Sequence, residues 1–96
     1  MQTMIATVAT PEPGLLINRL CKHFSHKIEA SWSSDTGHLR FSIGECRLYA
    51  EGTALTLACQ SPAHEELEEL GEVVASHLVR FARGYVDQVA WQARGA

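Results

Sequence analysis

The sequence predicts an α+β fold, a two-layer sandwich in which two helices cover one face of a mostly antiparallel sheet. Apolar and polar residues alternate through the middle of the chain, the period-two pattern of half-buried strands. Two flanking segments instead repeat their apolar residues at helical spacing. Ninety-six residues fit one hydrophobic core and leave no room for a second. We therefore expect a single domain over residues 1–96, with elements in the order β-α-β-β-β-β-α-β.

The first two elements are a short strand and a helix. Residues 4–9 include β-branched side chains and predict a strand, which the segment Thr10-Pro11-Glu12-Pro13 interrupts. The helix is expected over residues 13–24, because proline is well tolerated in a first helical turn. Its apolar stripe consists of Leu16, Ile17, Leu20, Cys21 and Phe24.

The middle of the chain predicts a four-strand antiparallel meander. Gly44-Glu45 and Gly52-Thr53 both place glycine first, as in two-residue type II′ hairpin loops. These loops predict a register with Phe41 opposite Leu48 and Cys46 opposite Cys59, which keeps apolar residues on one face. The other face is expected to meet water or a partner and carries His38, Arg40, Arg47, Tyr49, Thr56 and Gln60.

A second helix and a last strand complete the domain. Ser61 followed by Pro62 predicts a helix start, and the helix is expected to reach Phe81 or Ala82. Glutamates crowd its first half and arginines close it, which suits the helix dipole. The last strand is expected over residues 85–92. The buried stripe of the helix is expected to contain Leu67, Leu70, Val74, His77, Leu78 and Phe81.

Composition argues against several classes of function. Eight Lys and Arg against eleven Asp and Glu give a net charge of −3, whereas nucleic-acid binding normally requires a basic face. No apolar run is long enough to span a bilayer, and the N-terminus lacks the basic and apolar regions of a signal peptide. Three cysteines without C-x-x-C spacing do not suggest a disulfide framework. We therefore expect a cytoplasmic protein that binds neither nucleic acid nor membrane.

The first candidate site is the run Cys21-x-His23-x-x-His26. Sulfur and imidazole ligands suit zinc or iron. Residues two apart on a helix point in nearly opposite directions, however, so this triplet does not chelate one ion while it is helical. The simpler interpretation is a core thiol beside histidines at a helix C-terminus, where positive charge is favoured. We accordingly expect no metal and no cofactor.

The second candidate is His77, which falls on the buried stripe of the second helix. A core imidazole needs hydrogen-bond partners, so it is either a structural histidine bonded to a carbonyl or a functional base, ligand or pH switch. Arg80 follows one turn along. If the two helices pack side by side, His23 and His77 line one groove.

Common catalytic motifs are missing from the sequence. It contains no G-x-S-x-G, no H-E-x-x-H and no glycine-rich phosphate loop, so a non-enzymatic protein is favoured. Cys46 and Cys59, which share a face with leucines, are expected to be buried reduced thiols.

Three segments resemble a bacterial family, domain of unknown function 2218, over residues 6–91. They are Leu20-Cys21-Lys22-His23-Phe24-Ser25-His26-Lys27, Gly44-x-Cys46-x-Leu48 and Leu70-x-x-Val73-Val74-x-x-His77-Leu78-x-Arg80-Phe81. The resemblance implies a small bacterial protein without an assigned activity. It also implies an iron-related context, because some members look to be encoded beside, or fused to, siderophore-interacting reductases. The family pattern matches His23, Phe24, His26, Lys27, His77, Arg80 and Phe81.

We favour a binding or accessory domain that holds a small anionic ligand, such as a carboxylate or ferric siderophore, or a partner protein. One alternative is a metal-dependent or redox-linked protein that uses His23, His77 and a thiol. Another is a dimerisation module without a ligand, and burial in a homodimer would help so small a domain. The residues expected to bind are His23, His26, Lys27, His77 and Arg80.

Overall fold

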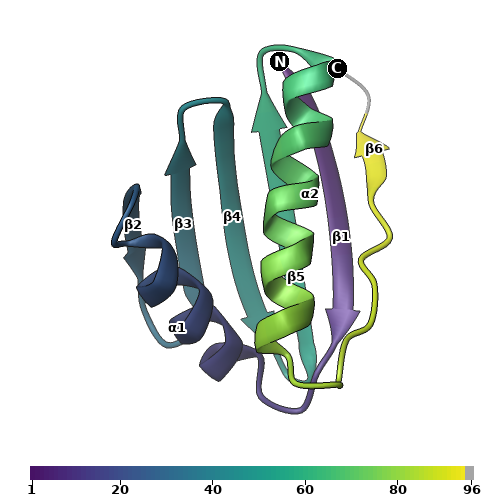
Figure 1. The fold of residues 1–96 in the computed structure, drawn as a ribbon. Helices are drawn as coiled ribbons and strands as arrows, with labels where there is room; N and C mark the ends of the chain where they lie inside the picture. The colour runs from purple at the N-terminus through teal and green to yellow at the C-terminus, as the bar shows by residue number, and fades with distance from the viewer. Residues whose placement is uncertain (95–96) are drawn as a thin grey trace.

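The structure, a computed structural model described here for residues 1–94, contains two helices packed on one face of a six-stranded sheet (Figure 1). The strands lie in the order β2-β3-β4-β5-β1-β6, and each neighbouring pair is antiparallel. This arrangement confirms the predicted α+β fold and its order of elements. In chain order the elements are β1 (Gln2–Ala9), α1 (Pro13–Phe24), β2 (Glu29–Trp32), β3 (Thr36–Phe41), β4 (Gly44–Glu51), β5 (Ala54–Ser61), α2 (His64–Phe81) and β6 (Gln92–Arg94).

The hairpin between β4 and β5 has the predicted register. Glu51 pairs with Ala54, so Gly52 and Thr53 form the two-residue loop, and Cys46 lies opposite Cys59. Gly52 has φ +60°, a left-handed conformation that glycine adopts without a steric penalty.

The predicted register between β3 and β4 is wrong by four residues, because the hairpin loop lies two residues earlier than predicted. Phe41 pairs with Gly44, so the loop is Ser42-Ile43, and the partner of Leu48 is Gly37. Gly44 serves a close approach between strands instead of a turn, because a Cβ there would collide with the carbonyl oxygen of Gln60. The apolar residues still face the helices, since a shift by an even number of residues preserves the face on which each side chain lies.

Two predicted boundaries also differ from the structure. The helix α2 begins at His64, whereas Ser61 ends β5 and its buried hydroxyl donates a hydrogen bond to the carbonyl of Ile43 at 2.5 Å. The expected last strand is confined to β6, and the irregular segment before it packs Val89 and Trp91 against the core. Both differences arise because tertiary contacts outweigh the local turn and strand signals.

The core lies between the sheet and the helices. The helix α1 covers β2, β3 and β4, and α2 covers β5, β4 and β1. Gly37 lets α1 approach the sheet, since a Cβ there would lie 2.9 Å from Sγ of Cys21. Within residues 1–94 neither helix is long and apolar enough to cross a membrane. The fully buried aliphatic side chains are Ile17, Leu20, Leu39, Leu48, Leu55, Leu57, Leu70, Val74 and Leu78.

Candidate functional site

The two helices meet in a cluster of rings. His23 lies in the last turn of α1, and its ring centroid is 5.2 Å from that of His77 on α2 and 5.2 Å from that of Phe81. Phe24 joins the cluster from beneath, 4.7 Å from His77 and 5.2 Å from Phe41 on β3. The helix contact therefore brings together two histidines that are far apart in the sequence.

His77 has a hydrogen-bond partner for one ring nitrogen. Its Nδ1 lies 2.7 Å from the carbonyl oxygen of Val73 one turn earlier, so Nδ1–H is the donor. When the ring is neutral, this bond leaves Nε2 as an acceptor. His77 is thus fixed in orientation by its own helix and by a tilted contact with the ring of Phe24.

His23 is partly buried, and its surroundings favour the neutral imidazole. Its pKa is lowered from the ordinary value of 6.5, first by desolvation and then by the positive charges of His77, Arg80, Lys27 and His26. Desolvation and like charges both oppose protonation. The ring therefore gains a proton less readily in the folded protein than in the unfolded chain.

The groups around His23 form what we call the cationic corner, made of Lys22, His23, His26, Lys27 and Arg80. Lys22 and His23 lie in the last turn of α1, and Arg80 lies in the last turn of α2 with its guanidinium 5.4 Å from the Phe81 ring centroid. His26 and Lys27 follow α1 in turns whose backbone N–H groups bond His23 and Phe24. Among the described residues, no carboxylate lies within ion-pair distance of any member of the corner.

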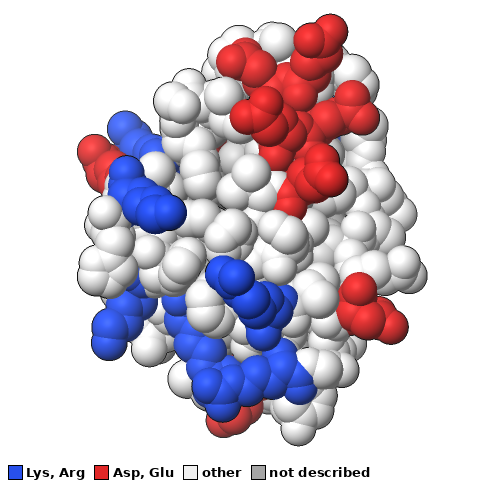
Figure 2. Space-filling model, viewed as in Figure 1, with Lys and Arg blue, Asp and Glu red and all other residues white. Residues whose placement is uncertain are grey.

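Charge is segregated along the helix face of the molecule. Figure 2 shows the largest group of acidic side chains over the upper part of α2, single acidic side chains nearer the left, right and lower edges, and basic side chains lower and to the left. The first turn of α2 carries Glu65 and Glu66, and its last turn carries Arg80. An anion that approaches this face is therefore drawn toward the cationic corner and away from the start of α2.

The thiols lie away from this corner. Sγ of Cys21 points into the core toward β3, and burial raises the pKa of Cys21 to about 11. The pKa of Cys46 is raised well above its ordinary value by a hydrogen bond with Cys59 and by burial. All three cysteines are free and buried. The part of the chain that the structure describes contains no group of three or more His, Cys, Asp or Glu side chains placed to hold a metal ion.

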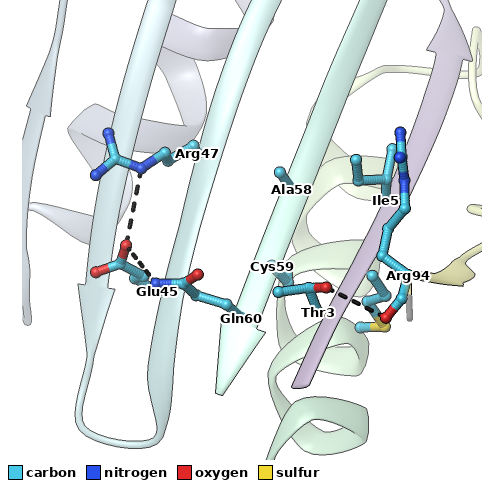
Figure 3. A pocket seen from close by; sticks show the side chains of 9 residues that line it. Thr3, Ile5, Glu45, Arg47, Ala58, Cys59, Gln60 and Arg94 are labelled. Carbon is cyan, nitrogen blue, oxygen red and sulfur yellow. Dashed lines mark hydrogen bonds and ion pairs between the residues drawn. The ribbon is translucent and has the colours of Figure 1, made fainter. Parts of the chain in front are cut away.

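Two features escaped the sequence analysis. Phe41 belongs to the ring cluster, and its position on the helix-facing side of β3 was the available signal. On the opposite face, Glu45 Oε1 accepts from Gln60 at 3.1 Å and lies 3.7 Å from Nε of Arg47 (Figure 3). Its Oε2 is 3.4 Å from Nε2 of His38. The alternation of residues along the strands placed His38, Arg47 and Gln60 on this face. It did not predict that Glu45, which was expected in a hairpin loop, contacts all three.

Comparisons with known proteins give the chain a family and a fold relative. The family model described as uncharacterized protein conserved in bacteria (DUF2218) matches residues 5–92. The NMR structure of PA4090 from Pseudomonas aeruginosa is 32% identical in sequence, covers 96% of each chain and superposes with a TM-score of 0.80. No curated protein matches the sequence.

Proposed function

Since this chain belongs to the bacterial family DUF2218, whose description names no activity, we propose its function from geometry. It is a non-enzymatic binding domain that holds an anionic ligand, or an anionic group of a partner protein, at the cationic corner. The observation that carries this proposal is the absence of a counter-charge. Lys27 and Arg80 lie close enough to His23 to lower its pKa, Lys22 precedes it in α1, and no described carboxylate pairs with any of the three.

The ring cluster supports this role by fixing the positions of the donors. Arg80 lies against Phe81, and His23 contacts Phe81 and His77, so part of the corner is ordered before a ligand arrives. Preorganised donors lose less conformational entropy on binding than free side chains do. Arginine and lysine together suit carboxylates, phosphates and the oxygen donors of a ferric siderophore.

The lowered pKa of His23 gives the proposed site a pH dependence. A bound anion favours the protonated imidazole and raises the pKa of His23 toward its ordinary value. Proton uptake therefore accompanies binding, and the affinity increases as the pH falls below about 6.5, the ordinary pKa of His23.

Titration followed by NMR tests the proposal. Citrate, inorganic phosphate and a gallium-loaded hydroxamate siderophore, a diamagnetic substitute for the ferric form, are added separately to ¹⁵N-labelled protein. We expect at least one ligand to shift the amide resonances of residues 22–27 and 77–81 in a saturable manner. Saturation by a ligand stabilises the fold, by about 2.7 kcal/mol at a hundred times Kd, which a thermal melt detects.

A pair of matched variants tests the charge dependence of binding. Lys22→Gln with Lys27→Gln removes two positive charges from the corner, and we expect affinity to fall by about tenfold. Ser34→Glu with Gln88→Glu lowers the net charge equally at exposed positions elsewhere, and we expect little change. Equal weakening by both pairs, or no saturable binding by any ligand in the panel, contradicts the proposal.

A further inference from the structure

We propose that the open face of the sheet binds a second copy of this chain, face to face, about a twofold axis that runs parallel to the strands between β4 and β5. This surface lies opposite the helices and so is independent of the cationic corner. The proposal rests on side-chain size, charge order and burial across that face.

Side-chain size divides the open face into two halves. Long or aromatic side chains project from β2, β3 and β4, which we call the high half; Tyr49 there is 44% exposed. Mainly Ala and Thr occupy the paired positions of β5 and β1, which we call the low half because these side chains project less. Rotation about the proposed axis places the high half of one copy over the low half of the other. The high half presents Glu29, His38, Arg40, Glu45, Arg47, Tyr49 and Glu51, and the low half presents Ala54, Thr56, Ala58, Thr7, Ile5 and Ala9.

A row of six side chains, one from each strand, determines which charges meet in the proposed dimer. The register aligns six side chains across the whole sheet, in the order Glu29, Arg40, Glu45, Gln60, Thr3 and Arg94. The twofold axis passes between Glu45 and Gln60. It therefore brings Glu29 of each copy to Arg94 of the other, and Glu45 to Gln60 of the other. The row is complementary to itself when reversed, which favours a second copy over an unrelated partner.

The next row supplies a recess. It runs Ser31, His38, Arg47, Ala58, Ile5 and Gln92. Ala58 forms the floor of a hollow of about 440 Å³, with Arg47 on one side and Arg94 on the other (Figure 3). The axis places Arg47 of the second copy over Ala58, and Tyr49 of the second copy over the neighbouring Thr56. Long side chains thus enter the space that small ones leave.

The charged groups of this face are already partly paired within each copy. Glu45 contacts Gln60, Arg47 and His38, and its side chain is only 25% exposed. Nε2 of His38 is buried and, among the described residues, has no hydrogen-bond partner, although it lies 3.4 Å from Oε2 of Glu45. Covering carboxylate and guanidinium groups that are already paired costs less than covering free charges. Three carboxylates (Glu29, Glu45, Glu51) are matched by three guanidinium groups (Arg40, Arg47, Arg94), so the face has no net charge that would select an acidic or basic partner.

The available area is sufficient for a stable dimer. The molecule measures 32 × 26 × 20 Å along its principal axes. The two longer dimensions enclose an area of the order of the 800 Å² that each partner buries in a standard interface. A sheet face of this size satisfies that requirement without rearrangement.

Sedimentation velocity over a concentration series tests the proposal. We expect a reversible dimer, and Ala58→Arg, which fills the hollow, to raise its Kd by about thirtyfold. Ser76→Arg, on the exposed surface of α2, is the control and should leave Kd unchanged. Circular dichroism spectra and melts establish that both variants are folded.

A charge exchange identifies the partner as a second copy in the predicted orientation. Glu29→Arg alone or Arg94→Glu alone places like charges together twice in a homodimer, so each is expected to weaken self-association. An equimolar mixture of the two variants restores both opposite-charge contacts, and we expect it to form heterodimers. Three results would overturn the proposal: a monomer at all concentrations, a dimer disrupted by Ser76→Arg but not by Ala58→Arg, or a mixture no tighter than its separate components. Lys22→Gln with Lys27→Gln should leave dimerisation intact, which separates this result from a failure of the anion site.

Discussion

The imidazole rings of His23 and His77 lie with their centroids 5.2 Å apart and their planes tilted by 39°, although they belong to different helices. This contact joins the last turn of α1 to α2 and places two titratable rings against Phe24. A positive charge on His77 opposes protonation of His23, because like charges at this distance repel. Protonation of His23 at acidic pH therefore places positive charge in the contact between the two helices.

The stability of the fold should fall as the pH drops below about 6.5. His23 has a lowered pKa in the folded protein and an ordinary value of 6.5 when unfolded, so the unfolded chain binds more protons between these two values. The loss begins near pH 6.5 and levels off below the folded pKa. Urea denaturation at several pH values measures it.

His23→Gln should reduce this acid sensitivity, whereas His64→Gln should preserve it. His64 is exposed at the start of α2 and contacts only Glu68 among the charged groups. An unchanged pH profile in His23→Gln would assign the acid response to other groups.

The three thiols should be unreactive in the native protein. Burial raises the pKa of Cys21 to about 11, a hydrogen bond with Cys59 and burial raise the pKa of Cys46 well above its ordinary value, and all three side chains are inaccessible. We expect Ellman's reagent to label no cysteine at pH 8 until denaturant is added, and then to label three. Ser34→Cys provides an exposed thiol as a positive control. Rapid labelling of a cysteine in the native protein would contradict this prediction and favour the alternative in which a thiol is part of the site.

Gly37→Ala should destabilise the domain by about 1–3 kcal/mol, the usual cost of overpacking a core. The new Cβ would lie 2.9 Å from Sγ of Cys21 and 3.1 Å from side-chain carbons of Ile17 and Leu48. Denaturant titration measures the cost. In a Cys21→Ala background the cost should be smaller, because the nearest atom is gone. Equal costs in both backgrounds would show that α1 moves freely away from the sheet.

Ser61→Ala should cost about 1 kcal/mol, since it leaves the carbonyl of Ile43 without the buried hydroxyl donor. Ser76→Ala is the matched control. Its hydroxyl bonds a carbonyl in the same way but on the exposed side of α2, so its loss is compensated by water. Equal effects from the two substitutions would mean that the Ser61 bond does not hold the β3–β4 turn.

Periodicity was sufficient to predict the fold because it records burial directly. The bounds of α1 and the register across Cys46 and Cys59 both follow from local signals that agree with packing. Gly44 and Ser61 were misassigned for one reason. Each resembles a local signal, a hairpin glycine or a helix cap, but is used for a contact with a distant strand.

The candidate site residues could be proposed from the sequence one by one, but their arrangement could not. Helical stripes placed His77 inward, and the spacing of Cys21 and His23 excluded a local chelate. The distance between His23 and His77 depends on how α1 and α2 cross, which no local pattern encodes. The isolation of the corner from carboxylates likewise depends on where the glutamates of α2 lie in space (Figure 2).

The position of β1 inside the sheet has a consequence for folding. This strand, Gln2–Ala9, lies between β5 and β6 and pairs with all eight residues of β5. Until the first residues of the chain dock there, β5 is an unprotected edge with alternating apolar side chains, the kind of edge that recruits other chains. Because β1 and β5 are far apart in the sequence, their pairing slows folding and leaves the edge of β5 open to aggregation until β1 docks. Damage to the first nine residues would thus endanger solubility before it affected any binding surface.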